Sequence, residues 1–201
     1  MAANSKDDMT FRPLTAAETV SWYADELSVT FGPQERKPLA DIQRMTDEGC
    51  YELWGLFDGD TLAGYATLWK AVGLPLVLLD YLGVNAARRG GGLGAEMLHR
   101  LKARGLSLVL ESELPEEAED EAQRDICVRR MAFYRRCGFE PVYRMATCGM
   151  AYQAMLNDPA GLPIEDVMRM HREIYGQLRL DVKVPLMEGE KTEMPYWMKG
   201  S

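Results

Sequence analysis

The chain lacks long apolar runs and has little positive charge, and each shortage excludes a class of protein. No apolar run approaches the ~20 residues that span a bilayer, and residues 1–10 are polar where a secretory signal would be apolar. The formal net charge of −8 argues against general binding to nucleic acids or anionic membranes, because those partners call for a basic surface. We therefore expect a cytoplasmic protein whose partner is a small molecule or a cationic group.

Cysteine and histidine are scarce as well. The chain has only four cysteines, at Cys50, Cys127, Cys137 and Cys148. They form no C-x-x-C pair and have no neighbouring histidine, so their spacing indicates neither a zinc site nor a disulfide framework, and we expect no metal. His99 is expected to face outward from a helix. His171 falls on an apolar helix face, where a packed histidine is a more ordinary interpretation than a catalytic one.

The remaining composition is that of a globular protein. The 201 residues are 47% apolar and 27% charged, which suits one domain with a substantial core, or one domain with an appendage. We expect a loose, flexible leader over residues 1–8, a main domain over 9–156, and a carboxy-terminal helix and tail over 157–201.

Hydrophobic periodicity predicts the elements of these segments. Thr15 and Glu18 have the spacing of a capping box, at the start of a helix that runs to about Thr30. The residues Asp58-Gly59-Asp60 separate two alternating strands, as a hairpin turn would. The predicted helices cover residues 15–30, 39–47, 93–101, 122–137 and 163–175. The predicted strands cover residues 9–12, 51–57, 62–69, 74–84, 106–110, 139–144 and 148–156.

A glycine-rich segment is the most informative feature of the sequence. It lies between the apolar stretch 74–84 and an amphipathic helix, and consists of Arg89-Gly90-Gly91-Gly92-Leu93-Gly94-Ala95. Glycines let backbone N–H groups turn toward an anion without a Cβ in the way, and a helix N-terminus carries about half a positive charge. This glycine cradle, residues 89–95, therefore predicts a binding site for a pyrophosphate.

One interpretation of the cradle is a dinucleotide site. Gly90-x-Gly92-x-x-Ala95 matches the fingerprint G-x-G-x-x-A, and Glu111 follows about twenty residues later, where a ribose-binding acid belongs. In dinucleotide folds, however, the glycines follow the first strand almost directly. Here residues 85–89 intervene, and the motif comes late in the chain.

The other interpretation rests on three segments, which together resemble the Gcn5-related N-acetyltransferase (GNAT) family. Residues 89–94 satisfy the acetyl-CoA signature Q/R-x-x-G-x-G/A, and residues 78–84 are similar to the family's fourth strand. Residues 132–139 are similar to its A-x-x-F-Y-x-x-x-G-F segment. The resemblance covers about Met9 to Leu156. It implies an α/β fold with a mixed, mostly antiparallel central sheet flanked by helices.

The same resemblance implies that acetyl-CoA is the acyl donor. The residues implied to bind it are Leu82, Gly83, Val84, Arg89, Gly90, Gly92, Leu93, Gly94 and Ala95. The N–H of Leu82 would polarise the thioester carbonyl as an oxyanion donor does, although a plain central strand is the alternative for this segment. Arg88 would lie near a phosphate or else be a solvated surface residue. Many relatives have an asparagine where Cys127 stands, so Arg129 and Arg130 would take over its contact or the contact would be absent.

Tyr134 is the catalytic residue that the resemblance implies, as the acid that protonates the leaving thiolate. A phenol with a pKa near 10 donates to a thiolate whose acid has a pKa near 8.5 at a cost of only ~2 kcal/mol. On helical spacing alone, Tyr134 shares a face with Cys127 and Met131. Packing in the core is therefore the alternative role for this side chain.

Glu111 and Glu113 are the candidates for the base that deprotonates the amine. They alternate to one face at the end of the predicted fifth strand, and either could relay a proton through water. They belong to an acidic cluster formed by Glu111, Glu113, Glu116, Glu117, Glu119, Asp120 and Glu121. The cluster could attract a cationic amine, whereas a solvated loop is the alternative interpretation for most of its members.

These features predict an N-acetyltransferase that moves an acetyl group from acetyl-CoA to a primary amine by direct attack in a ternary complex. The amine would belong to a small molecule or a peptide and would be cationic, and the enzyme could be a homodimer. A non-catalytic acyl-CoA sensor and a dinucleotide-binding protein remain as alternatives. Only the enzyme releases free thiol when an amine is supplied, and only the dinucleotide-binding protein prefers NAD to CoA.

Overall fold

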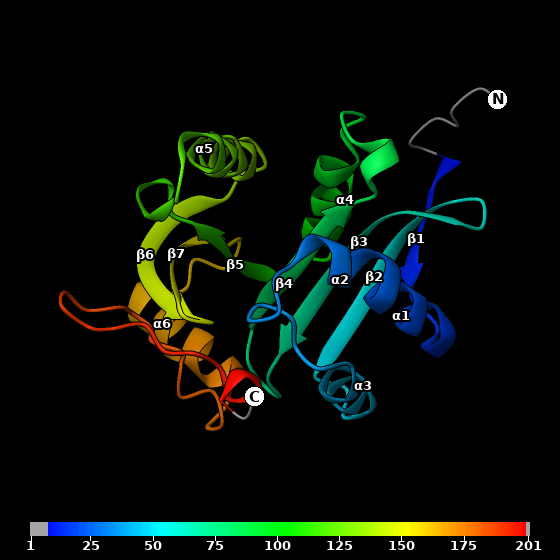
Figure 1. Cartoon of the computed structure of the whole chain (residues 1–201). Helices are drawn as coiled ribbons and strands as arrows, with labels where there is room; N and C mark the ends of the chain where they lie inside the picture. The colour runs from blue at the N-terminus through cyan, green and yellow to red at the C-terminus, as the bar shows by residue number, and fades with distance from the viewer. Residues whose placement is uncertain (1–7, 200–201) are drawn as a thin grey trace. The chain divides into compact units, whose positions relative to one another are not determined.

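Seven strands form a mixed sheet flanked by helices in the computed structural model, which describes residues 8–199 (Figure 1). The strand order is β1-β2-β3-β4-β5-β7-β6. The strands are β1 Thr10–Pro13, β2 Tyr51–Asp58, β3 Thr61–Lys70, β4 Leu76–Val84, β5 Ser107–Glu113, β6 Glu140–Thr147 and β7 Met150–Asn157. This is the fold class that the sequence predicts.

The helices fall between the strands in the predicted order. The α-helices are α1 Ala16–Trp22, α2 Ser28–Thr30, α3 Leu39–Asp47, α4 Leu93–Lys102, α5 Glu121–Arg136 and α6 Ile164–Ile174. A π-helical turn, η2 Tyr23–Leu27, joins α1 to α2, so the predicted helix up to Thr30 is one run with a wider turn inside it. The named 3₁₀ helices among the described residues are η3 Ala86–Arg88, η4 Pro115–Glu117 and η5 Tyr196–Met198.

The chain divides into two compact units. The first unit consists of the described residues up to Trp69 together with Leu79–Gly105, and the second consists of Lys70–Leu78 together with the described residues from Leu106 onward. The boundaries predicted for the domains stay a prediction. Most of the predicted leader, residues 1–7, lies outside the described residues.

In the first unit, local signals in the sequence set the ends of the helices. Thr15 caps α1: its side chain accepts a hydrogen bond from the Glu18 amide while the Glu18 carboxylate accepts one from the Thr15 amide, which confirms the predicted capping box. Further along, Leu93 and Met97 on one face of α4 are buried in a cluster with Leu56 of β2 and with Met9 and Ala63. This packing fixes the start of α4 and hence the position of the glycine cradle.

In the second unit, β7 pairs antiparallel with both β5 and β6. The register places Glu111 opposite Ala154 and Glu113 opposite Tyr152, so the two acids share one face of the sheet as predicted. Helix α5 begins at an Asp120 cap, whose side chain accepts from the Gln123 amide, and ends before Gly138, whose φ of 84° is the predicted left-handed stop.

The segment after α6 is bonded more closely to the sheet than its irregular sequence suggests. Lys183 forms an isolated bridge with Ala146 of β6, and the side chains of Arg179 and Asp181 are buried. Between residues 8 and 199, no helix is both long and apolar enough to cross a membrane.

Candidate active site

The glycine cradle lies in the first unit, where η3 leads into α4. Gly90 has a φ of 84° and Gly92 a φ of 72°, a left-handed conformation that side-chain-bearing residues rarely adopt. Gly92 is the N-cap of α4, and the first bond of the helix runs from the Glu96 amide to the Gly92 carbonyl over 3.1 Å. The amides of Leu93, Gly94 and Ala95 therefore precede the hydrogen-bond ladder of the helix. This is the backbone geometry with which a helix N-terminus binds an anion.

The strand that precedes the cradle needs a glycine of its own. A Cβ on Gly83 would lie 2.3 Å from the Tyr65 ring, far closer than carbon atoms approach. Its neighbours Leu82 and Val84 are partly buried against the cluster around Leu93. The backbone of this strand end is thus held at a fixed position, while the role of its N–H groups in binding a thioester stays a prediction.

The two arginines beside the cradle have different surroundings. Arg88 pairs with Asp58 at 2.8 Å between Nη1 and Oδ2. Arg89 is exposed, and its Nε lies 3.4 Å from the Val84 carbonyl oxygen. The charge of Arg88 already has a partner, whereas Arg89 is exposed. The contact of Arg89 with a phosphate stays a prediction.

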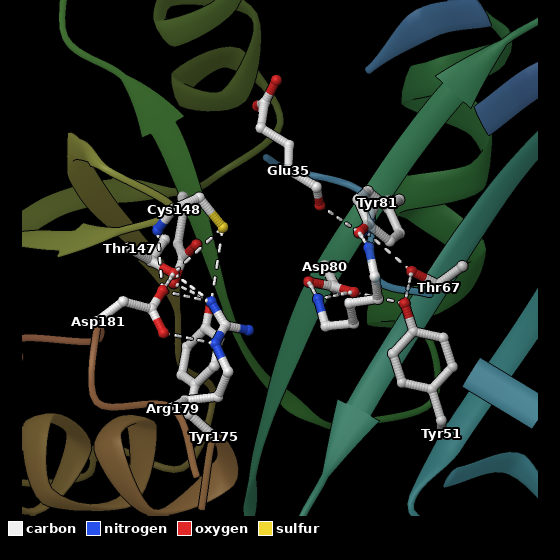
Figure 2. Close-up of polar contacts among 12 residues, drawn as sticks. Glu35, Tyr51, Thr67, Asp80, Tyr81, Thr147, Cys148, Tyr175, Arg179 and Asp181 are labelled. Carbon is white, nitrogen blue, oxygen red and sulfur yellow. Dashed lines mark hydrogen bonds and ion pairs between the residues drawn. The ribbon is translucent and has the colours of Figure 1, made fainter. Parts of the chain in front are cut away.

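A buried ion pair in the first unit was not predicted from the sequence. The Nζ atom of Lys37 lies 2.7 Å from Oδ1 of Asp80 in β4, and both side chains are 7% exposed. The hydroxyl of Tyr51 also donates to Asp80, and that of Tyr81 donates to the Glu35 carbonyl (Figure 2). Burial raises the pKa of Tyr51 well above its usual value, and the Asp80 charge raises it further, so this hydroxyl stays a donor. An aspartate inside the apolar run 74–84 was the available signal for this cluster.

Tyr134 lies in the last turn of α5 in the second unit. It is partly buried, and its ring packs at an angle against Phe133 and Phe139. Burial raises the pKa of its hydroxyl; the charge of Arg130 lowers it, and that of Glu113 raises it. The phenol therefore keeps its proton at neutral pH, which a general acid requires.

Glu113 lies in the same neighbourhood as Tyr134. Its carboxylate pairs with Arg130 at 2.5 Å and lies 3.5 Å from the Sγ atom of Cys127. Burial, followed by the charge of Glu113, raises the pKa of this thiol, so Cys127 is a packed thiol rather than a thiolate. The structure thus brings Glu113 and Tyr134 close to Arg130, for which the sequence predicts only a substitute contact with the cofactor.

Glu111 is held by residues that lie far from it in the sequence. Its Oε1 atom accepts a hydrogen bond from the Tyr175 hydroxyl at 2.7 Å and lies 3.0 Å from Nε2 of His171, within hydrogen-bond distance. His171 is fully buried on α6, as its apolar helix face predicts. His171 and Glu111 lie sixty positions apart in the sequence. Their contact therefore cannot be predicted from a local sequence pattern.

The acidic cluster borders a pocket of about 640 Å³ within the second unit. Its lining includes Glu113, Glu117 and Glu119, together with Glu190 and Lys191 of the carboxy-terminal segment. The carboxylates outnumber the single lysine, so the lining is negative. Within the described part of the chain, no group of three or more histidine, cysteine or acidic side chains is arranged to hold a metal ion.

The sequence matches the profile of the acetyltransferase (GNAT) family over residues 16–139. That span contains the glycine cradle, Glu111, Glu113 and Tyr134, and ends before Tyr143, His171 and Tyr175. A comparison with curated protein sequences gives no match.

Solved structures of acetyltransferases have the same fold. A protein from Bacteroides thetaiotaomicron, described as belonging to the GNAT family, is 26% identical with a TM-score of 0.62, over 84% of this chain and 99% of that one. A Salmonella typhimurium protein solved with its cofactor acetyl-CoA is 19% identical with a TM-score of 0.52, over 77% of this chain and 97% of that one. A variant of the Vibrio cholerae spermidine N-acetyltransferase is 11% identical with a TM-score of 0.57, over 75% of this chain and 94% of that one.

Proposed function

Since the chain belongs to the acetyltransferase (GNAT) family and is therefore an acyltransferase, we propose that it transfers an acetyl group from acetyl-CoA to a primary amine. The observation that carries this proposal is the geometry of the cradle, where Gly90 and Gly92 have positive φ angles at the start of α4. A side chain there would strain the backbone and fill the space before the helix amides. The cradle therefore fits the pyrophosphate of CoA, and the presence of acetyl-CoA in the similar Salmonella protein supports the same donor here.

The binding residues of the first unit follow from this geometry. The amides of Leu93, Gly94 and Ala95 would donate to the pyrophosphate, Arg89 would add charge, and Gly90 and Gly92 keep the approach open. The main chain of residues 82–84 would bind the pantetheine arm. When bound, the cofactor supplies an acetyl thioester, whose carbonyl carbon is the electrophile.

The proton-transferring residues lie in the second unit. A cationic amine must first lose one proton, which Glu111 or Glu113 takes directly or through a water molecule. The neutral nitrogen then forms a bond to the acetyl carbon while the carbon–sulfur bond breaks, and Tyr134 donates a proton to the sulfur. The second proton, released at the nitrogen, restores the Tyr134 hydroxyl through water. The attack is direct, with both substrates bound, and no acetylated side chain is formed.

The acceptor that the second unit fits best is a cationic amine. The carboxylates of Glu113, Glu117, Glu119 and Glu190 around the pocket favour a positively charged guest. The similarity to a spermidine N-acetyltransferase extends to the fold alone at 11% identity, so it is the negative lining that supports this substrate class. A polyamine or a lysine-containing peptide has the required charge.

A thiol-release assay with a panel of amines tests the proposal. Cationic amines should release free CoA thiol from acetyl-CoA, and anionic or neutral amines of similar size should release less. A protein that binds CoA but releases no thiol with any amine would instead be an acyl-CoA sensor. A protein that binds NAD in preference to CoA would overturn the interpretation of the cradle.

A further inference from the structure

Glu111 lies within a chain of hydrogen bonds that extends beyond the segment matched by the family. The chain runs from the Tyr143 hydroxyl to Nδ1 of His171 over 2.8 Å, then from Nε2 of His171 to Oε1 of Glu111 over 3.0 Å. The Tyr175 hydroxyl reaches the same Oε1 atom at 2.7 Å. Tyr143, His171 and Tyr175 all follow residue 139, where the family match ends. The surroundings of Glu111 are therefore built by the carboxy-terminal part of this chain.

The direction of each hydrogen bond follows from the chemistry of the acceptor. An ionised carboxylate only accepts, so Tyr175 O–H and His171 Nε2–H both donate to Glu111. A neutral imidazole with its hydrogen on Nε2 has a lone pair on Nδ1, which accepts from the Tyr143 hydroxyl. Tyr143 is suited to this role because burial raises the pKa of its hydroxyl, with a further contribution from the Glu111 charge.

Burial fixes the orientation of this group. The His171 side chain is 0% exposed and the Glu111 side chain 13%. A buried ring bonded at both nitrogens has one orientation, since any rotation would leave a buried polar atom without a partner. Its fixed position holds Oε1 of Glu111 in turn.

The two candidate bases differ in the partners that hold them. Glu113 is bound to the guanidinium of Arg130 at 2.5 Å, and protonation of Glu113 would leave that fixed charge without its partner. The donors to Glu111 are a hydroxyl and an imidazole. A hydroxyl can turn its hydrogen away when the carboxylate takes up a proton, so these partners permit proton transfer.

We propose that His171 and Tyr175 are positioning residues that hold the Glu111 carboxylate as the base that deprotonates the acceptor amine. The proposal rests on the acetyl-transfer function proposed above and assigns the base to Glu111 rather than to Glu113. Tyr143 supports the assignment by holding the tautomer of His171.

Several other charged or titratable groups surround this chain of hydrogen bonds and have to be considered in any measurement against pH. Glu113 lies two residues along the same strand with Arg130 of α5 bound to it. On the other side, the Arg179 guanidinium lies 4.9 Å from the centre of the Tyr175 ring and is bonded to Asp181 (Figure 2). A kinetic test at one pH with substitutions that keep these groups intact is therefore preferable to a titration.

Nitrogen-15 NMR tests the geometry without any activity measurement. The chain has only two histidines, and the exposed His99 serves as the internal reference. We expect the spectrum of His171 to show hydrogen on Nε2 and to change in Glu111→Gln, while the signals of His99 stay the same. Hydrogen on Nδ1 alone would overturn the proposal, because His171 could not then donate to Glu111.

A double-mutant cycle tests the role in the reaction. His171→Met removes the donor at similar volume, and we expect kcat to fall ~10-fold with the affinity for CoA unchanged. His171→Gln keeps an N–H donor and should recover much of the loss. In a Glu111→Gln background, His171→Met should lower kcat by less than about 2-fold further, because the residue acts through Glu111.

The remaining outcomes separate this proposal from the proposed function. Additive losses from Glu111→Gln and His171→Met in an active enzyme would overturn the positioning role and leave acetyl transfer standing. An unaltered protein that acetylates no amine would overturn both. If His171→Met does not fold, Tyr175→Phe removes one donor with little change of shape, and the same non-additivity with Glu111→Gln is expected. His99→Gln, on the exposed face of α4, is the matched control and should leave kcat unchanged.

Discussion

Among single residues, Arg130 acts on two neighbours, Glu113 and Tyr134. Arg130 binds the Glu113 carboxylate directly, and its charge lowers the pKa of Tyr134 against the effect of burial. The same guanidinium therefore contacts the Glu113 carboxylate beside the pocket and partly offsets the rise that burial causes in the pKa of Tyr134. Removal of Arg130 would affect both groups, so it is less informative than a change at Tyr134 itself.

Tyr134→Phe should lower kcat by ~10²-fold, the scale of a lost general acid, while the affinity for CoA stays within a few-fold. The ring contacts with Phe133 and Phe139 are kept, so the fold should be unaffected. The measurements are steady-state kinetics and CoA titration, with Tyr196→Phe in η5 as the control. Unchanged turnover, with the chemical step shown to limit the rate, would return Tyr134 to a packing role.

The residues that the sequence did not predict share one property, which is a long separation along the chain. The capping box of Thr15 and Glu18 can be predicted from the sequence because the two residues lie only three positions apart. Lys37 and Asp80 lie 43 positions apart and His171 and Glu111 lie 60 apart. Hydrophobic periodicity shows that each of these residues is buried or at a strand end. It does not show which distant residue each of them contacts.

At the scale of elements, the predicted boundaries hold where local physics sets them. Helix α3 covers Leu39–Asp47 as predicted, and begins directly after its N-cap residue Pro38, whose ψ of 139° is not helical. Strand β5 runs to Glu113 rather than to Leu110 because backbone pairing with β7 continues past the apolar residues. Strand β6 likewise extends to Thr147. Apolar patterning underestimates a strand whose last residues are polar.

The start of α4 permits a sharp test of the cradle. Gly94→Asp places a carboxylate in the first turn, where it favours the helix but repels a pyrophosphate. Gly94→Ala still satisfies the signature and adds no charge. We expect CoA to raise the melting temperature of the unaltered protein and of Gly94→Ala, and to leave that of Gly94→Asp unchanged. An equal shift in Gly94→Asp would contradict the assignment of the cradle.

The cap of α1 should make part of the stability depend on pH. Hydrogen bonds from Arg12 and from the Thr15 backbone lower the pKa of Glu18 from 4.5 to about 2. A carboxyl whose pKa is lower in the folded state contributes stability that is fully present above pH 4.5 and is lost as the pH falls toward 2. Urea denaturation of Glu18→Gln should therefore show a smaller loss of stability over this range than the unaltered protein. Equal losses would show that the ion pair with Arg12 does not contribute.

At the scale of the whole molecule, the net charge of −8 and the negative pocket act in the same direction on a cationic substrate. Exposed carboxylates attract a cationic substrate over a distance, and salt screens this attraction. A general base instead removes a proton from one atom of the bound substrate. Glu117→Gln and Glu119→Gln should therefore raise KM about two- to five-fold and reduce its dependence on salt, with kcat unchanged. Glu111→Gln should mainly lower kcat. Kinetics at several salt concentrations check this, and the same salt-dependent rise in KM for all three variants would mean that Glu111 is not the base.

The whole account depends on the transfer of an acetyl group to an amine. Acetyl-CoA with an isotopically labelled acetyl group, incubated with the protein and a cationic amine, provides the most direct measurement. We predict that mass spectrometry finds the label in an N-acetylated amine, in an amount equal to the CoA thiol released. Label that stays in acetyl-CoA, or that is found only in free acetate, for every amine tested would contradict the account.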